Sequence, residues 1–337
     1  MSSIYSILRI NAKIKNFRIK LFGIWLFHVF GKRYIGIFLD PVLACNFRCK
    51  MCYFSDEEKR KTYKGILKYE DIEIIADKLF HRALKLQIGC GAEPTVYKDW
   101  IKIVELGKQK NIPYISLTTN GNLLTKEQLM YSVEKGLNEI TLSAHGLTRE
   151  TYESMMVNGN YDLFLDLLDN ISDVKKVFPE FKLRVNYTIN KENMDELSEI
   201  WNVFGDAIDI LQMRPVQKIG DTVYNDFDLN FFCEKYDAVI SPLIDECQKR
   251  NIVCIAPDKE NLLVLKDGKD KDMIIEEATY CYVSAQGCWK DDFDYHVDSF
   301  ESFSSKHMLG KNLFAGIFKR RENKDVNVSR KMNYKVN

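Results

Sequence analysis

The sequence predicts an α/β fold in which parallel strands alternate with helices. After residue 34, short runs of β-branched and aromatic residues alternate six times with longer segments of helical period. The chain has 337 residues, 46% of them apolar, which suits one large domain with a small extension. Six βα units in succession imply right-handed crossovers between parallel strands. A doubly wound sheet and a complete or partial barrel both satisfy this pattern.

The expected elements follow one another along the chain. The strands are expected at residues 34–39, 84–89, 114–119, 139–144, 182–189 and 209–216. The helices are expected at residues 69–83, 99–110, 126–136, 160–177, 193–205 and 229–250, the last with a kink near Pro242. In the fourth helix, Leu163, Leu167, Ile171 and Val174 form one apolar face. No glycine-rich dinucleotide fingerprint follows the first strand, so a nicotinamide-binding sheet has no support.

The N-terminal segment is basic and apolar. Residues 1–33 carry seven Lys or Arg residues, and no acid precedes Asp40. The apolar run 21–30 is too short to span a bilayer, which takes roughly 20 residues, and no small-residue cleavage site follows it. A helix packed across the bottom of the main domain is favoured over an amphipathic helix on an anionic membrane. The chain is predicted to have four parts: a basic amphipathic segment (1–33), a core barrel (34–256), a C-terminal extension (257–318) and a basic flexible tail (319–337).

Composition excludes some classes of function. Lys plus Arg and Asp plus Glu both total 48, so no net charge favours nucleic acid or an acidic partner. Nine cysteines are too few and too unevenly spaced for a secreted disulfide scaffold. Reduced thiols in the cytoplasm are therefore expected.

Three cysteines stand close together just after the first expected strand. Cys45, Cys49 and Cys52 fall within eight residues, and the nearest later histidine, His81, is far along the chain. Structural zinc requires four ligands, usually in two close pairs. A [4Fe–4S] cluster can be held by three thiolates from one loop, which leaves its fourth iron open for a substrate or cofactor. The spacing therefore favours a cluster over zinc.

This spacing resembles the signature of the radical S-adenosylmethionine (SAM) enzymes, whose open iron is chelated by SAM. Later segments agree with the resemblance: "GAEP" (91–94) is similar to the family's Gly-Gly-Glu-Pro, and "TTNG" (118–121), "LSAHG" (142–146) and "RVNYTIN" (184–190) match patterns at other strand ends. One departure is Ala92, where the family usually has Gly. The resemblance covers residues 34 to about 220. It implies a partial (β/α)6 TIM-like barrel whose active site opens at the carboxyl ends of the strands.

The resemblance also implies a set of site residues. The [4Fe–4S] cluster would be ligated by Cys45, Cys49 and Cys52. SAM would be contacted by Tyr53, Gly91, Ala92, Glu93, Asn120, Ser143, Arg184 and Asn186. In this scheme Tyr53 lies beside the adenine, Glu93 and its loop hold the amino group, and Arg184 or Asn186 meets the carboxylate or ribose. No residue has a pattern that marks it as the catalytic acid, base or radical relay.

By the same resemblance, the reduced cluster cleaves SAM to a 5′-deoxyadenosyl radical, which abstracts hydrogen from the substrate. The electron donor would be a flavodoxin or ferredoxin. A peptide or protein and a cell-envelope saccharide precursor both stay open as substrates. The alternative is a non-catalytic iron–sulfur or zinc-binding module with a decayed SAM site. A cytoplasmic location is expected, and peripheral membrane contact through residues 1–33 stays open.

Two further cysteines lie in the extension. The position of Cys281 and Cys288 matches a cysteine-rich C-terminal domain, called SPASM or twitch, that holds auxiliary clusters in peptide-modifying members of the family. With Cys254 they supply three thiolates, one short of a full set. We therefore expect a single cluster and a degenerate or independent extension. Cys90, Cys233 and Cys247 lie amid apolar patterning and are expected to be buried.

Overall fold

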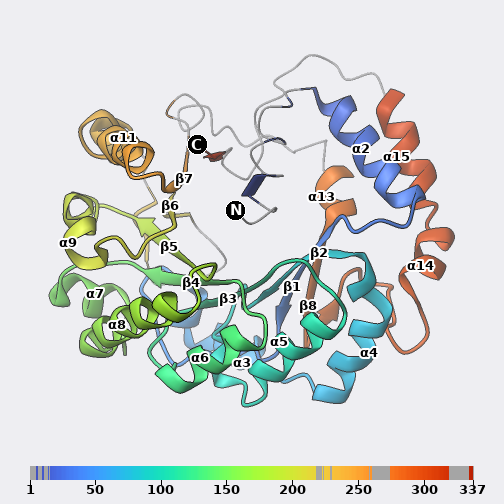
Figure 1. The fold of residues 1–337 in the computed structure, drawn as a ribbon, viewed down its shortest axis with the longest axis horizontal. Helices are drawn as coiled ribbons and strands as arrows, with labels where there is room; N and C mark the ends of the chain where they lie inside the picture. The colour runs from blue at the N-terminus through green and yellow to red at the C-terminus, as the bar shows by residue number, and fades with distance from the viewer. Residues whose placement is uncertain are drawn as a thin grey trace.

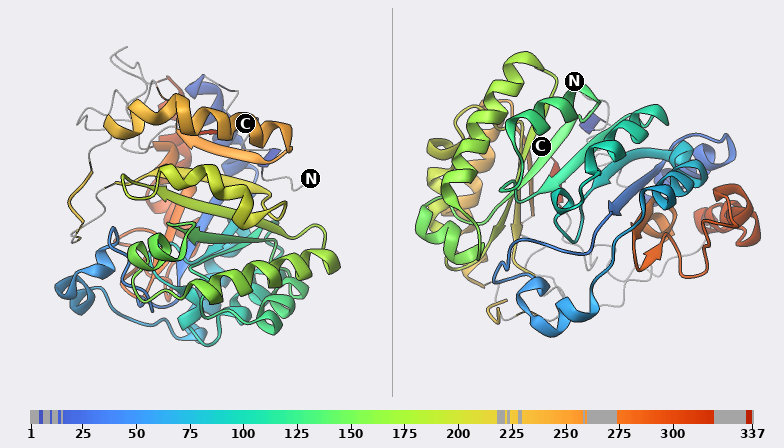
Figure 2. Two further views of the ribbon diagram at one scale, coloured as in Figure 1. Left: turned by 90° about the vertical axis from the view of Figure 1, so that its left-hand side faces the viewer. Right: turned by 90° about the horizontal axis from the view of Figure 1, so that it is seen from below.

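One curved sheet organises the chain, with helices on its outer face (Figures 1 and 2). The computed structural model describes residues 5–6, 10, 14, 16–217, 222, 224–227, 230–257, 259, 274–318 and 334–336. The strand order is β10-β7-β6-β5-β4-β3-β2-β1-β8-β9. The six predicted strands are β1 (Ile35–Asp40), β2 (Ala83–Ile88), β3 (Ile115–Thr119), β4 (Glu139–Ala144), β5 (Lys182–Ile189) and β6 (Ile210–Pro215). They pair in parallel in chain order, so the predicted α/β barrel fold is confirmed.

The predicted helices also form, with changes in the last two. The first four are α4 (Tyr69–Leu79), α5 (Trp100–Gln109), α6 (Lys126–Glu134) and α8 (Tyr161–Val177). Residues 193–205 split into a 3₁₀ turn, Asp195–Glu199, and α9 (Ile200–Phe204). Residues 230–249 comprise α10 (Asn230–Lys235), a π-helical turn over Tyr236–Ile240 and α11 (Ser241–Lys249). The irregular turn thus ends at Ile240, two residues before Pro242, the residue expected to kink this helix.

Four strands complete the sheet beyond those predicted. They are β7 (Val253–Pro257), β8 (Tyr280–Ser284), β9 (Gly287–Cys288) and β10 (Tyr334–Val336). β7 continues the parallel order beside β6. β8 pairs in parallel with the free side of β1, from Gly36↔Tyr280 to Asp40↔Ser284. Residues 257–318, expected to lie outside the βα rhythm, therefore supply a strand to the sheet. Of the predicted basic tail, 319–337, only residues 334–336 lie within the described part of the chain.

Alternation along the strands separates an apolar outer face from a polar inner wall. In β5 the residues Leu183, Val185, Tyr187 and Ile189 are buried, while the residues between them are half-buried. Register places Ser143 beside Asn186 and Asn186 beside Gln212 on this inner wall. Polar side chains thus line the barrel interior, and the core lies between sheet and helices.

The N-terminal helix packs against the end of the described chain. α2 (Phe17–Val29) lies beside α15 (Leu309–Phe318), and Leu21, Leu313 and Ile317 are buried between them (Figure 1). The ring of His28 lies against Gly310, so the two helices run antiparallel. Among the described residues, every helix is too short or too polar to cross a membrane.

Candidate cluster and cofactor site

The loop after β1 carries the three clustered cysteines. Cys45, Cys49 and Cys52 are half-buried and carry free thiols. Burial raises the pKa of Cys45 to about 12 and also raises the pKa of Cys49 and Cys52, and the charges of neighbouring thiolates add to the effect for Cys45 and Cys49. The three sulfurs are therefore close enough to interact. Without a cation to offset their charge, they stay protonated.

Backbone contacts fix this loop to the segment that follows β4. The N–H of Arg48 donates to the carbonyl of Val157 at 2.8 Å, and that of Lys50 donates to Met155 at 3.0 Å. The Arg48 guanidinium also donates to the carbonyl of Cys45 at 2.7 Å. The loop is held in shape by the protein, independently of any bound group.

The donor set suits an iron–sulfur cluster. The thiols belong to one loop, and within the described ranges no three His, Cys, Asp or Glu side chains converge closely enough to hold one metal ion. In a [4Fe–4S] cube each thiolate binds a different iron, which requires a wider spacing than a single ion does. The side-chain amide of Asn120 lies 3.9 Å from Cys45 Sγ, where an N–H can stabilise a thiolate.

The loop after β2, residues 90–94, is held by a buried carboxylate that sequence reasoning missed. Asp40, at the end of β1, accepts hydrogen bonds from the backbone N–H groups of Cys90 at 2.7 Å and Gly91 at 2.9 Å. Tyr282 of β8 donates its hydroxyl to the same carboxylate at 2.7 Å. Burial raises the pKa of Asp40, and these donors oppose that rise.

Tyrosines pack around the same loop. Tyr53 donates its hydroxyl to the carbonyl of Gly91, and the hydroxyls of Tyr63 and Tyr282 lie 2.9 Å apart. A Cβ at position 91 would lie 2.7 Å from the Tyr53 hydroxyl, so any larger residue would displace this hydroxyl from its hydrogen bond. Ala92, the departure from the family pattern, is not among the described residues with positive φ, so its methyl group causes no backbone strain.

Glu93 links this loop to the end of β3. Its buried Oε1 accepts hydrogen bonds from Thr95 and from the hydroxyl of Thr119 at 2.7 Å, and Oε2 accepts from the N–H of Asn120 at 2.8 Å. Asn120 in turn donates to Asn46 Oδ1 at 2.8 Å. A continuous set of contacts thus joins Glu93, Asn120 and the cysteine loop. Glu93 also caps the short 3₁₀ helix Pro94–Val96.

The remaining predicted residues separate into two groups. Ser143 and Asn186 are register partners on the inner wall, and Asn186 Oδ1 is buried with no hydrogen-bond partner in the described structure. Arg184 lies two residues nearer the start of β5. There its guanidinium is 3.8 Å from the buried carboxylate of Glu139, which also accepts hydrogen bonds from Tyr5 and Tyr114. The structure therefore places Arg184 in a buried charged cluster near the strands' amino ends, away from the cysteine loop.

One inner-wall residue near the strand ends was not predicted. His145 follows β4, and its Nδ1 accepts a hydrogen bond from the N–H of Thr188 at 3.3 Å. Burial lowers the pKa of His145 to about 4, and the charge of Arg214 contributes. The sequence "LSAHG" contained this histidine, but strand-end position alone did not distinguish it from a turn residue.

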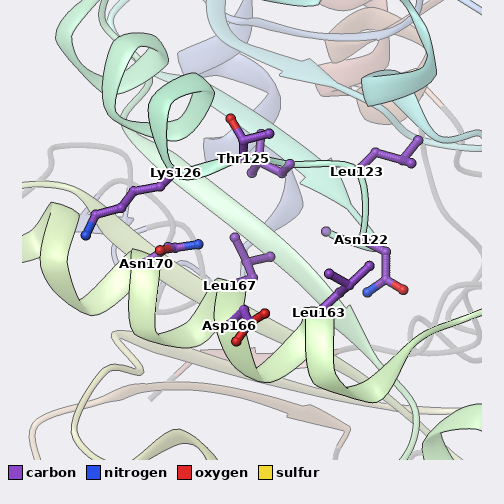
Figure 3. A pocket seen from close by; sticks show the side chains of 10 residues that line it. Asn122, Leu123, Thr125, Lys126, Leu163, Asp166, Leu167 and Asn170 are labelled. Carbon is purple, nitrogen blue, oxygen red and sulfur yellow. The ribbon is translucent and has the colours of Figure 1, made fainter.

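A separate pocket lies among the helices (Figure 3). It is formed by the loop 121–126 and by one face of α8, where Leu163, Asp166, Leu167 and Asn170 contribute side chains. None of the predicted site residues lines this pocket.

Comparisons with known proteins agree with this geometry. Residues 40–202 match the Radical SAM superfamily. Probable GTP 3′,8-cyclases of Saccharolobus islandicus and Saccharolobus solfataricus are 27% identical to this chain, over 63% of its length and 67% of theirs.

Solved structures show the same fold. Streptococcus suis SuiB bound to S-adenosylmethionine has a TM-score of 0.63 and 15% identity, over 87% of this chain and 70% of that chain. The structure of anSMEcpe with bound AdoMet has a TM-score of 0.60 and 15% identity, over 87% and 88%. Family match, relatives and fold agree: residues 40–202 form a radical SAM domain, the kind of domain that uses a [4Fe–4S] cluster and SAM as cofactors.

Proposed function

We propose that Cys45, Cys49 and Cys52 ligate the [4Fe–4S] cluster and that SAM binds beside it, across the carboxyl ends of β1 to β5. The observation that carries this proposal is the continuous contact from Glu93 through Asn120 to Cys45. Three segments far apart in sequence meet there. Bound in this place, the cluster and SAM supply a 5′-deoxyadenosyl radical for hydrogen abstraction.

The residues of the chain have distinct proposed roles. Gly91 and Ala92 offer backbone groups to the amino group of SAM, while Glu93 fixes their loop and adds negative charge. Tyr53 lies beside the adenine. Asn186, whose Oδ1 has no protein partner in the described structure, is available to a polar ligand on the inner wall, and Ser143 lies next to it. These are the groups that position SAM and exclude water.

The substrate we propose is polar. In the part of the chain that the structure describes, the side-chain oxygens of Thr118 and Asn186 on the inner wall are buried without a hydrogen-bond partner, and Gln212 and Arg214 lie on the same wall. Such a wall suits a polar molecule better than an acyl chain. A peptide or protein side chain and a cell-envelope saccharide precursor both satisfy this condition. Because the relatives are named probable GTP 3′,8-cyclases, GTP should also be tested as a substrate.

We further propose that a flavodoxin or ferredoxin supplies the electron, and that the protein works in the cytoplasm with a peripheral membrane contact through residues 1–33. The core barrel, residues 34–256, would hold both cofactors, and residues 257–318 would support it through β8.

The test uses protein purified and reconstituted without oxygen. Wild type should bind about four irons and four sulfides at this loop and, when reduced, release 5′-deoxyadenosine from SAM. Replacing all three loop cysteines by Ala should remove the iron and leave the fold intact. The matched control replaces Cys90 and Cys233, two thiols outside the loop, and should keep the iron.

Three outcomes would contradict the proposal. A triple variant that keeps its iron would exclude these ligands, and one zinc per chain in iron-replete protein would support the zinc alternative. A cluster that forms in wild type but neither binds nor cleaves SAM would identify a non-catalytic iron–sulfur module instead.

A further inference from the structure

The helix α2 is apolar on both of its faces. Its inner face packs on α15, where Leu21 is fully buried and Trp25 contacts Phe314 with ring centroids 5.0 Å apart. Its outer face should then be polar, as on most surface helices. The sequence of α2, FRIKLFGIWLFHV, instead supplies apolar side chains there too.

This outer face is exposed. Ile19 is 56% exposed, Phe22 44%, Phe27 51% and Phe30, directly after the helix, 68%. Ile19, Phe22, Leu26 and Phe30 follow one another at intervals of three and four residues, so they form one stripe along the helix, and Phe27 flanks this stripe on the side of Phe30. α15 adds Phe314 at 43% and Phe318 at 68% on the same helical pair. Apolar side chains gathered in this way mark an interaction surface, whereas singly scattered ones do not.

The charges around the stripe identify the partner. Arg18 is exposed and Lys20 half-buried, and at 100° per residue they fall on opposite sides of the stripe. Lys32, beyond the end of the helix, is also exposed. Residues 1–39 contain no Asp or Glu, and three basic residues, Arg9, Lys13 and Lys15, precede the helix. A surface that combines exposed Phe with flanking Lys and Arg, and with no acid, is complementary to an anionic lipid bilayer.

We propose that the exposed face of the α2–α15 pair, formed by Ile19, Phe22, Phe27, Phe30, Phe314 and Phe318, docks on an anionic membrane surface. This deepens the peripheral contact proposed above, since it names the face, adds α15 and states the lipid charge. It does not depend on the radical chemistry. Lys20 fits this role, because its pKa is already lowered by partial burial and a nearby lipid phosphate would favour its charged form.

Docking in this way leaves the cofactor site accessible. α2 ends just before β1 begins, so the pair lies toward the amino ends of the strands, and the cysteine loop follows the carboxyl end of β1 (Figure 1). The surface would therefore hold the enzyme at the bilayer while the barrel mouth stays open to substrate.

The experiment is flotation of the full chain with vesicles of phosphatidylcholine, alone or mixed with phosphatidylglycerol. Wild type should float with the mixed vesicles and bind pure phosphatidylcholine at least about tenfold more weakly, and added salt should release it. Phe27→Ser with Phe30→Ser should weaken binding about tenfold, because two exposed aromatic rings no longer enter the interface. Arg18→Gln with Lys32→Gln should weaken binding to the mixed vesicles by a similar factor.

Matched controls separate docking from misfolding. Ile66→Ser with Val177→Ser removes two side chains of similar exposure, 68% and 60%, on another part of the surface, and should leave flotation unchanged. All the replaced side chains are largely exposed, so the unfolding temperature and SAM cleavage should match wild type in every variant. SAM cleavage without flotation would overturn the docking proposal alone, and flotation without SAM cleavage would overturn the proposed function alone.

Three results would overturn the proposal. The first is no flotation with either vesicle. The second is equal binding to both lipid compositions. The third is a self-associated wild type that Phe27→Ser with Phe30→Ser converts to monomer without any change in flotation, which would make this face a contact between copies of the chain.

Discussion

Asp40→Asn should weaken SAM binding without removing the cluster. The carboxylate of Asp40 accepts from two successive backbone N–H groups, those of Cys90 and Gly91, and from the hydroxyl of Tyr282. An asparagine has only one oxygen, so its amide must face one of these donors with its own N–H groups. The hydroxyl of Tyr282 can turn to accept, but a backbone N–H cannot.

The magnitude follows from these contacts. Asp40 is fully buried, so water cannot replace the lost acceptor. One or two charge-assisted hydrogen bonds, each worth about 1.5–3 kcal/mol, are lost, which suggests a total of about 2–4 kcal/mol. Part of this free-energy loss should lower the stability of the fold. The rest should lower SAM affinity, because the loop at Gly91, which we propose to hold SAM, is displaced. Tyr282→Phe removes only one donor and should cost about 1 kcal/mol.

The assay measures urea unfolding, iron content and SAM affinity on reconstituted protein. Tyr131→Phe, which removes a hydroxyl bonded to Glu105 at the surface, is the control and should leave all three unchanged. Asp40→Asn with wild-type stability and wild-type SAM affinity would refute the reasoning. Loss of iron along with SAM binding would show instead that Asp40 shapes the cysteine loop.

Four further results are expected. Glu93→Gln should lower SAM affinity about tenfold or more in isothermal titration, because its new amide faces the N–H of Asn120; unchanged affinity would leave Glu93 only a helix cap. Cys281→Ala should leave iron per chain unchanged, and a loss of iron would indicate an auxiliary cluster. Glu139→Gln should cost about 3–5 kcal/mol in urea unfolding, since Arg184 is then buried without its carboxylate; a cost below about 1 kcal/mol would argue against the pair. Because the pKa of His145 falls from 6.5 to about 4 on folding, the unfolded chain binds its proton first. Stability should therefore decrease by up to about 3 kcal/mol as the pH falls from 6.5 to 4, and His145→Gln should flatten this dependence.

Local patterns predicted much of the fold. Strands β4 and β5 begin and end at the expected residues, because period-two alternation and the flanking helices define them without reference to distant partners. β8 was missed because its five residues lack a following helix, and because its place beside β1 depends on a pairing across nearly the whole chain. Such long-range pairing leaves no local signal.

The sequence predicted which side of the sheet each site residue faces, but not how far along its strand the residue lies from the cysteine loop. Alternation along β5 puts Arg184 and Asn186 on the same inner wall, yet one lies in a buried ion cluster and the other near the strand ends. The step of two residues, roughly 7 Å along a strand, decides which group is near SAM. Asp40 was missed for another reason: its partners are backbone N–H groups of a loop fifty residues later, which no side-chain motif reveals.

The pairing of β1 with β8 has a consequence for biosynthesis. β1 leaves the ribosome long before its second neighbour, from Tyr280 to Ser284. Until then, one edge of β1 and the carboxylate of Asp40 lack their partner, and unpaired strand edges attract other chains. Closing so long a loop is entropically costly, so the barrel should complete itself late. Cluster insertion would then follow synthesis of β8, and chains that stall before residue 280 would become substrates for chaperones and proteases.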